Sequence, residues 1–366
     1  MPSSPIYQAV PIQENEPQAR TSRSLLATVM LTICVVSFVL QTELAQYVQR
    51  TTNYQKPYFI LWVGHCGYIF MGVLQLVAEC IARRHMPHKN IVHLIRLTIK
   101  ECKQEVIESA ASLEPRPRRW IYRIIAITIL LTLPAYLWFV SVNLTTMSTL
   151  TAIYNTGCFF AYLFSIIILG DPIMRSKVMA VLLCIIGVGI MAFWADDNDN
   201  DNGDDKSGIM GLLGILVATT CAATYGFYEV FYKKIASPPQ PSVLFANVVT
   251  TGIGLATLLL LWIPIPLLHW TGYETFQMPD PATFGYILCV GSMSVIYNAT
   301  FMCVISLANP VFAAVGVMLT VPAVAIVDVL VTGVMIPTAT IVGSILILVG
   351  FYILNRDMKE NNDDDQ

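Results

Sequence analysis

Two carboxylates lie inside long apolar stretches of this sequence, where charged side chains are not expected. Glu43 lies three residues from the end of the first stretch, and Asp328 lies in the last third of the ninth. Neither has a basic residue three or four positions away with which it could pair on its own helix. Because a charge at membrane depth costs free energy unless it is paired or faces water, we expect both carboxylates to line a hydrated site. There they could attract a cation or exchange a proton.

Several uncharged polar residues and one histidine lie at similar depth and could bind a small molecule through hydrogen bonds. Each also has a structural alternative, since a buried histidine can satisfy a neighbouring helix and buried amides commonly join helices. These candidates are Gln41, His65, Tyr154, Asn155 and Asn298.

Two further glutamates lie nearer the inner ends of their segments. Glu79 precedes Arg83 by four residues, and Glu229 precedes Lys233 by four. Such pairs form on one helix face and contribute a few tenths of a kcal/mol, so each could be a surface ion pair. Glu229 and Lys233 could instead form a gate at the inner end of the site.

Aromatic residues are concentrated in the third, fourth and sixth apolar segments, and Tyr136 and Tyr225 are the candidates for stacking. A flat organic ring would bind between such faces, with a carboxylate supplying charge for a cationic group. Ordinary packing in the bilayer or at its surface is the alternative.

The elements that must position these residues are transmembrane helices. Hydrophobic residues make up 55% of the chain, charged residues only 12%, and the mean hydropathy is +0.64. Stretches of about 20 apolar residues, enough to cross a bilayer, recur along the chain. We expect ten spans, at 24–46, 57–82, 119–141, 144–169, 176–194, 208–232, 241–263, 283–306, 310–333 and 337–355.

The distribution of Lys and Arg predicts the orientation. With both termini cytoplasmic, eighteen of the 21 basic residues fall on the inner side and only Arg50, Lys56 and Lys206 on the outer side. We expect disordered cytoplasmic tails over 1–23 and 356–366, no signal peptide, and an acidic outer loop over 195–207. The inner loop 83–118 has helical apolar spacing, which indicates either a helix on the inner membrane surface or a plain connector.

The segment 150–193 has a faint copy 163 residues later, in which Gly170 falls on Gly333 and Gly187 on Gly350. This shift spans an odd number of helices, so the copy would be inverted in the membrane. We therefore expect an all-α integral membrane protein of ten transmembrane helices, built as two inverted five-helix repeats over 24–194 and 208–355. Inverted repeats are typical of carriers that expose one central site alternately to each side.

The segment Ser148–Phe193 and its partner Asn309–Leu354 resemble the EamA-type halves of the drug/metabolite transporter superfamily. Two shorter stretches, ATYGFYEVFYKK at Ala223–Lys234 and GVMLTVPAVAIVD at Gly316–Asp328, resemble the solute carrier 35 family, subfamily F, especially its thiamine-transporter-like branch and fungal relatives. The resemblance implies ten helices in two halves and transport of small organic solutes in an endomembrane or the plasma membrane, with the fungal relatives often vacuolar. We expect an endomembrane, vacuolar or Golgi, rather than the plasma membrane. It maps the family aspartate after the Val-Pro turn onto Asp328, whereas animal members commonly have Lys where this chain has Glu229.

The leading functional hypothesis is secondary transport of a small, heterocyclic or cationic, thiamine-like metabolite by alternating access. A nucleotide-sugar or other metabolite antiporter is the alternative within the superfamily, although no Lys or Arg lies deep in an expected span to bind phosphates. A non-transporting membrane scaffold is the alternative of another class. No ATP-binding loop or HExxH pair occurs, so we expect neither an ATP-driven pump nor an intramembrane metalloprotease.

We expect no enzymatic activity, no cofactor and no bound metal. The expected partners are membrane lipids, the small-molecule substrate and protons, without nucleic acid, and a homodimer is compatible with the sequence.

Overall fold

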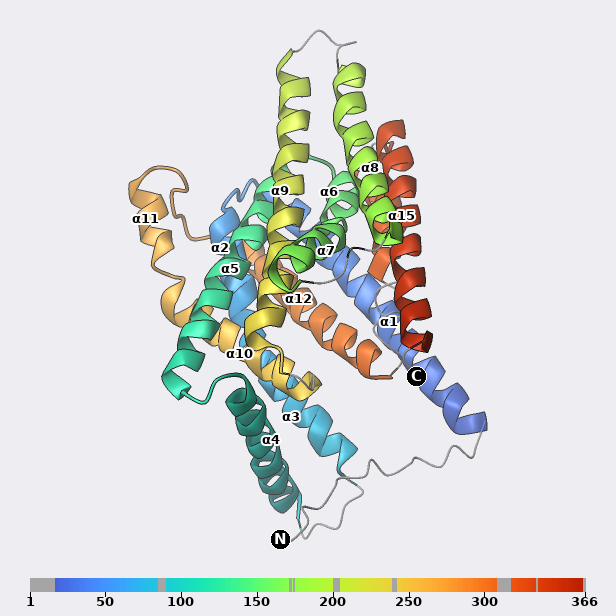
Figure 1. Ribbon diagram of the computed structural model, residues 1–366. Helices are drawn as coiled ribbons and strands as arrows, with labels where there is room; N and C mark the ends of the chain where they lie inside the picture. Colours follow the sequence, from blue (N-terminus) through green and yellow to red (C-terminus); the bar gives the residue numbers. More distant parts are fainter. Residues whose placement is uncertain are drawn as a thin grey trace.

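Almost all of the chain that the computed structural model describes is helical (Figure 1). The described residues are 17–84, 90–170, 173, 175–199, 205–238, 242–307, 317–333 and 335–364, and no β-strand occurs within them. The elements are α1 (Pro17–Gln46) with a π-helical turn (Tyr47–Thr51), α2 (Pro57–Cys66), a 3-10 turn (Gly67–Ile69), α3 (Phe70–Ala82), α4 (Ile91–Leu113), α5 (Pro117–Leu144), α6 (Met147–Tyr154), α7 (Gly157–Ile168), α8 (Arg175–Asp199), α9 (Asp205–Ala236), α10 (Val243–Leu260), α11 (Pro264–Trp270), α12 (Pro281–Leu307), α14 (Thr320–Thr332) and α15 (Thr338–Asp364).

Seven of these helical segments are long and apolar enough to cross a membrane. Three shorter apolar helices, over 178–191, 320–331 and 338–350, fall within the expected fifth, ninth and tenth spans. The start of the ninth expected span, residues 310–316, lies outside the described residues. The protein is therefore a helical membrane protein, as its composition predicts.

Helices extend beyond several of the boundaries expected from hydropathy, most of all next to the expected tails and acidic loop. α1 begins at Pro17, α8 continues to Asp199, and α15 continues to Asp364. The expected tails and acidic loop are thus partly helical, and their remaining residues 1–16, 200–204, 365 and 366 lie outside the described residues. Apolarity marks only the lipid-embedded part of a helix, whereas its hydrogen-bonded backbone can continue into water.

The expected helix in the loop 83–118 is α4, which packs against α3 and α10. Its buried side chains are Leu94, Thr98 and Cys102, whereas Ile91 and Ile99 are exposed. Arg83 connects it to α3, because the Arg83 guanidinium pairs with Glu79 at 3.2 Å and also with Glu101 of α4. The ion pair expected between Glu79 and Arg83 is confirmed.

α8 and α15 cross at glycines whose backbones nearly touch. A Cβ atom on Gly187 would lie 2.8 Å from the carbonyl oxygen of Gly343, and one on Gly350 would lie 2.9 Å from that of Ala180. The 163-residue shift of the sequence repeat carries residue 187 to 350 and residue 180 to 343. The two contacts therefore exchange under the repeat, which is the contact pattern of two antiparallel helices related by a two-fold axis.

The crossing between the α2–α3 segment and α10 is also close. A Cβ on Gly72 would lie 2.9 Å from Thr251 Oγ1, and one on Gly254 would lie 2.6 Å from the amide nitrogen of Ile69. Residue 72 thus meets residue 251 and residue 69 meets residue 254, so the two segments run antiparallel.

A carboxylate holds the segment after α11 over the start of α2. Glu274, which is only 8% exposed, accepts hydrogen bonds from the N–H groups of Tyr58 at 3.1 Å and Phe59 at 3.2 Å. These donors belong to the first turn of α2, which lacks intrahelical acceptors. Lys56 and Tyr54 add hydrogen bonds to the same segment, at Thr275 Oγ1 and the carbonyl oxygen of Gln277. We call this side of the bundle the α11 end and the opposite side the α4 end (Figure 1).

Replacing Glu274 should reveal the opposing effects of burial and capping. Burial raises the pKa of this carboxyl more than the two N–H donors and Lys56 lower it. The folded state therefore binds the proton more tightly than the unfolded state, so this contribution to stability is complete below about pH 4 and is lost as pH rises through the raised pKa. In thermal melts of the purified protein, Glu274→Gln should flatten the decline in stability between about pH 4 and pH 7. Glu274→Ala should cost about 1 kcal/mol by removing the cap, and an unchanged pH profile in the Gln variant would contradict the assignment.

A second pair of variants tests the glycine crossing. Gly187→Ala should destabilise the protein by about 1–3 kcal/mol, because the new Cβ forces α8 and α15 apart. Gly189→Ala is the matched control two residues away on the same helix, where a Cβ would meet nothing within 4 Å. Melting temperatures in detergent should fall for the first variant only, and equal values for both would refute the close crossing.

Candidate functional site: a tyrosine-lined cavity

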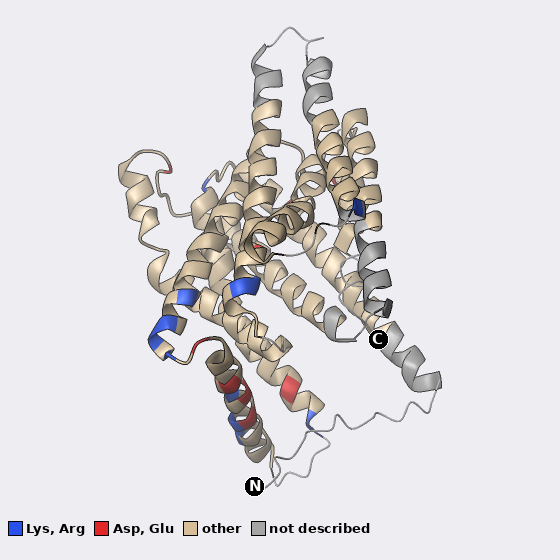
Figure 2. Cartoon of the chain, viewed as in Figure 1, with Lys and Arg blue, Asp and Glu red and all other residues tan. Residues whose placement is uncertain are grey.

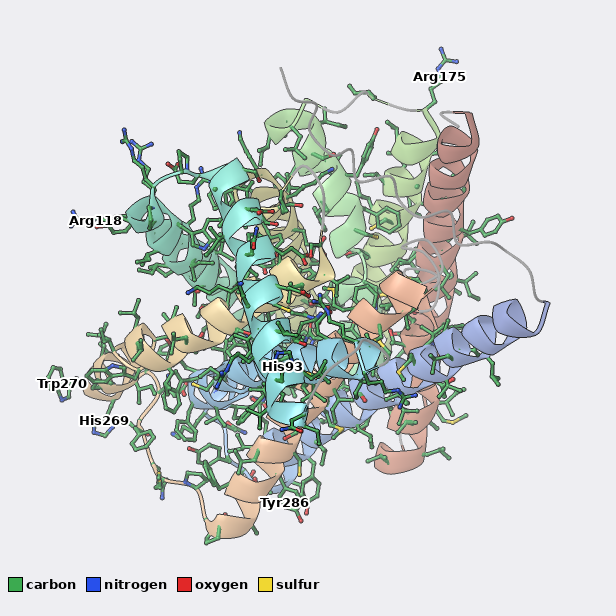
Figure 3. All side chains as sticks on the ribbon, turned by 90° about the horizontal axis from the view of Figure 1, so that it is seen from below. His93, Arg118, Arg175, His269, Trp270 and Tyr286 are labelled. Atoms are coloured by element: carbon green, nitrogen blue, oxygen red, sulfur yellow. The ribbon has the colours of Figure 1, made fainter. Side chains whose placement is uncertain are left out.

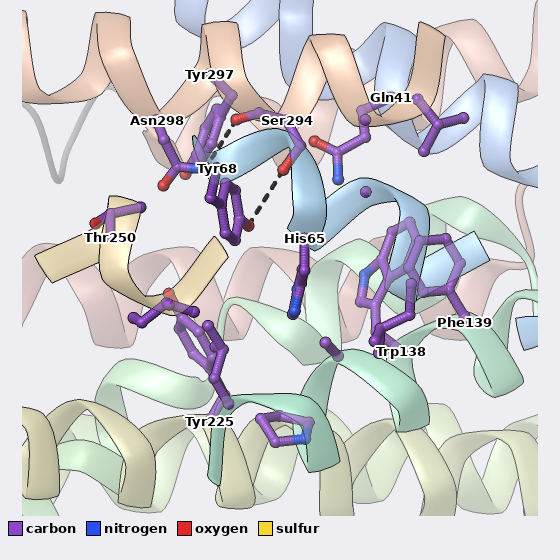
Figure 4. Close-up of a pocket in the computed structure, with 18 of the residues that line it drawn as sticks. Gln41, His65, Tyr68, Trp138, Phe139, Tyr225, Thr250, Ser294, Tyr297 and Asn298 are labelled. Carbon is purple, nitrogen blue, oxygen red and sulfur yellow. Dashed lines mark hydrogen bonds between the residues drawn. The ribbon is translucent and has the colours of Figure 1, made fainter. Parts of the chain in front are cut away.

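A cavity of about 180 Å³ lies among the helices. This volume is roughly ten times the ~15 Å³ that one water molecule needs, so a small organic molecule could occupy part of it. Aromatic rings and a few polar groups form most of its wall (Figure 4). The lining residues are Phe38, Gln41, Leu61, Gly64, His65, Tyr68, Leu131, Pro134, Ala135, Trp138, Phe139, Tyr154, Tyr225, Tyr228, Thr250, Ile253, Val290, Gly291, Ser294, Tyr297 and Asn298.

The α2–α3 segment positions two of these rings by approaching α12 closely. A Cβ on Gly291 would lie only 3.2 Å from the Cα of Gly64, so glycine at both positions lets the backbones meet. The chain then passes through the 3-10 turn that begins at Gly67. His65 and Tyr68 stack with ring centroids 5.1 Å apart and face the cavity (Figure 4).

The fourth expected span coincides with an apolar helical segment over Met147–Ile168, which a two-residue turn interrupts. α6 ends at Tyr154 and α7 begins at Gly157, and the side chains of Asn155 and Thr156 bond back to carbonyl oxygens of α6. Such side-chain bonds compete with the helical backbone pattern. The break places Tyr154 at the cavity wall.

Several hydrogen-bonding groups face this space. The Tyr68 hydroxyl lies 3.3 Å from Ser294 Oγ, and Asn298 Nδ2 donates to the Ser294 carbonyl oxygen at 2.8 Å (Figure 4). The buried Nδ1 atom of His65 has no hydrogen-bond partner among the described residues. Gln41 contributes an amide from α1. A bound molecule with donors and acceptors would therefore find partners on three helical segments.

Tyrosines of α6, α9 and α12 share an acidic neighbour. The rings of Tyr154 and Tyr225 lie 5.1 Å apart. Glu229, two helical turns before the end of α9, interacts electrostatically with both of these phenols and with Tyr297. Glu229 is exposed, and it is not among the ion pairs of the described residues, so it does not pair with Lys233, which is also exposed. Its carboxylate lies beside the cavity on the side toward the α4 end.

Glu43 and Asp328 lie elsewhere, toward the α11 end, where they interact electrostatically with each other. Asp328 Oδ2 accepts the Ser148 N–H at 3.1 Å, in the first turn of α6. Arg50 donates to the last carbonyl oxygens of α5, at 2.7 Å from Nη2 to Val142 and 2.6 Å to Thr145. An acid thus holds the positive end of α6 and a base the negative end of α5, as helix dipoles favour.

The other residues expected to bind the substrate form two groups, those that line the cavity and those that do not. Gln41, His65, Tyr154, Tyr225 and Asn298 line the cavity, whereas Asn155 and Tyr136 do not. Asn155 is buried and bonds to Thr151 of its own helix, and the Tyr136 ring packs 6.2 Å from that of Tyr58. Their roles in binding stay predictions.

Sequence analysis missed some polar lining residues that helical spacing could have found. Tyr68 follows His65 by three residues and Ser294 precedes Asn298 by four, so each shares a helix face with a candidate. Tyr228 likewise follows the candidate Tyr225 by three residues, whereas Trp138 has no such signal.

Comparison with known proteins finds similarity to membrane transporters. Residues 106–193 match the EamA-like transporter family. An uncharacterized vacuolar membrane protein of Saccharomyces cerevisiae is 22% identical over 93% of this chain and 92% of its own length. A thiamine-repressible mitochondrial transport protein of the same yeast is 21% identical over 91% of this chain and 92% of its own. Solute carrier family 35 member F5 of Macaca fascicularis is 27% identical over 53% of this chain and 43% of its own.

These matches confirm the resemblance based on the quoted stretches. With the helical membrane architecture, they support a membrane transporter that is similar to EamA-like transporters and to solute carrier 35 subfamily F.

Proposed function

We propose that this protein is a secondary active transporter that carries a small heterocyclic or cationic metabolite by alternating access. The observation that carries the proposal is the cavity among the helices, which is lined by aromatic rings and a few polar groups. Glu229 lies beside its tyrosines, on the side toward the α4 end. A space of this kind between membrane helices is where a carrier would bind a small molecule.

Two observations support ten spans arranged as inverted repeats. The contacts of α8 with α15, which exchange under the 163-residue shift of the sequence repeat, fit a pseudo-two-fold axis in the membrane plane. Gly170 and Gly333, which the 163-residue shift superimposes, both have positive φ, at 78° and 69°. Only glycine adopts this conformation readily, so two helices end in the same way at equivalent positions.

Charge supports a cytoplasmic α4 end. Lys and Arg gather around α4, the start of α5 and the end of α9 (Figure 2). Seen from this end, Arg118 projects from the periphery, where it could meet lipid headgroups (Figure 3). Both termini would then be cytoplasmic, and the vacuolar relative favours an endomembrane.

The lining favours an aromatic or cationic substrate over a phosphorylated one. It contains no Lys or Arg among the described residues, whereas phosphate recognition needs such groups. This argues against nucleotide-sugar exchange. Tyrosine faces and the nearby Glu229 would attract a heterocyclic cation. A relative named as thiamine-repressible makes thiamine the first compound to test. The substrate contacts would come from Tyr154, Tyr225, His65, Gln41 and Asn298, with Glu229 at the entrance.

Neutralising the entrance carboxylate tests the substrate class. Glu229→Gln should reduce uptake of thiamine or a similar cation into vesicles about tenfold at limiting concentration, since a lost charge-assisted contact is worth roughly 1.4 kcal/mol. Glu108→Gln, which changes an exposed glutamate of α4, is the control and should transport normally. Equal uptake by both variants would contradict a role for Glu229.

Two substitutions of one ring separate stacking from hydrogen bonding. Tyr225→Phe keeps the aromatic face, so we expect its Kd for the substrate to stay within about twofold of that of the native protein. Tyr225→Ala should lose about 1 kcal/mol of binding free energy, or roughly fivefold in Kd. Ligand-dependent thermal shifts of the purified variants measure both Kd values. A larger loss in the Phe variant than in the Ala variant would refute stacking.

A further inference from the structure

Three charged groups surround the corner between α5 and α6 at the α11 end, and we call them the corner cluster. They are Glu43 of α1, Arg50 of the π-helical turn that follows it and Asp328 of α14. None of the three lines the cavity.

Two members of the cluster are accounted for by their contacts. Arg50 donates from Nε and Nη2 to the carbonyl oxygen of Val142 and from Nη2 to that of Thr145, and its charge also acts on Asp328. Asp328 accepts the Ser148 N–H at the positive end of α6. Asp328 thus has an N–H donor and the cation of the cluster as partners.

Glu43 has no comparable support. Both of its carboxyl oxygens are buried, and neither has a hydrogen-bond partner among the described residues. The charged group that acts on it from α14 is Asp328, which is also acidic. The remaining elements near the cluster contribute uncharged groups, namely Asn143 of α5, Ser148 and Thr149 of α6, Thr340 of α15, and the paired rings of Tyr47 and Tyr286. A second buried carboxylate here would be strongly unfavourable.

Building on the proposed transport cycle, we propose that Glu43 is the proton-binding site that locks the α11-side gate. Closure requires the Glu43 carboxylate to bind a proton from water on that side, forming a neutral carboxyl group that can be buried beside Asp328. Opening brings water to the carboxyl group and returns the proton to the same side. Acid at the α11 end therefore favours the conformation open toward the α4 end.

Cysteine labelling can test the gate without any substrate. Val48 is fully buried near the corner, so a Val48→Cys reporter reacts with a membrane-impermeant maleimide from the α11 side only when the gate opens. Its labelling is compared with that of the parent protein, which has nine native cysteines. Because the maleimide reacts with the thiolate, each labelling rate is divided by the rate of free cysteine with the same reagent at the same pH. We expect this corrected rate to be higher at pH 8 than at pH 5.5, by up to about tenfold per pH unit for one linked proton.

Two additional substitutions in the reporter distinguish a proton lock from general loosening. Glu43→Gln mimics the protonated group, so labelling should be slow at both pH values while the melting temperature is retained. Asp328→Asn keeps an acceptor for Ser148 but removes the neighbouring charge, so Glu43 ionises more easily and the response should move to lower pH. Glu274→Gln, which changes another buried carboxyl at this end, should leave the pH response of the reporter intact.

Three outcomes would overturn the proposal. The first is a corrected labelling rate that does not depend on pH, and the second is absence of labelling at both pH values. The third is a Glu43→Gln variant of the reporter whose labelling responds to pH as that of the Val48→Cys reporter does. Failure of the proposed transport function gives a different result from failure of the gate. If no candidate substrate is transported while labelling still follows pH through Glu43, the gate assignment holds and the substrate assignment fails.

Discussion

Helix ends inside a membrane protein must find partners for their free backbone groups, and the corner between α5 and α6 depends on this constraint. Arg50 satisfies the last carbonyl oxygens of α5, and Asp328 satisfies an N–H group at the start of α6. These side chains come from α1 with its π-helical turn and from α14, so closing one corner draws four helices together. The same contacts bring Glu43 near Asp328, so that a negative charge on Glu43 would be repelled by that of Asp328.

Glycine contacts determine how closely the other helices approach. Gly187 and Gly343 allow α8 and α15 to touch, and Gly64 and Gly291 do the same for α2 and α12. In lipid, such packing supplies association energy that the hydrophobic effect does not. Around the cavity the bulky aromatic rings hold the helices apart instead. Glycines at the helix crossings and aromatic residues between the crossings leave a cavity that is lined by rings rather than by backbone.

The two glutamates closest to the proposed transport path differ in surroundings rather than in chemistry. Glu229 lies beside the tyrosines of the cavity. Glu43 lies at the opposite end near Asp328, and its two buried carboxyl oxygens have no hydrogen-bond partner among the described residues. The proposals assign substrate attraction to the first and proton binding to the second because of these different neighbours.

The sequence by itself determined the helical membrane class, the main apolar segments, the helix in the loop 83–118 and the pair of Glu79 with Arg83, since all of these depend on composition or on contacts within a few residues. It also identified Gly170 and Gly333 as equivalent. Only the tertiary structure decided that Glu229 is near the cavity while Glu43 and Asp328 are at a corner, and that the fourth span breaks at Asn155. Periodicity gives the face of a helix on which a residue lies, but the neighbours of that face come from segments more than a hundred residues away.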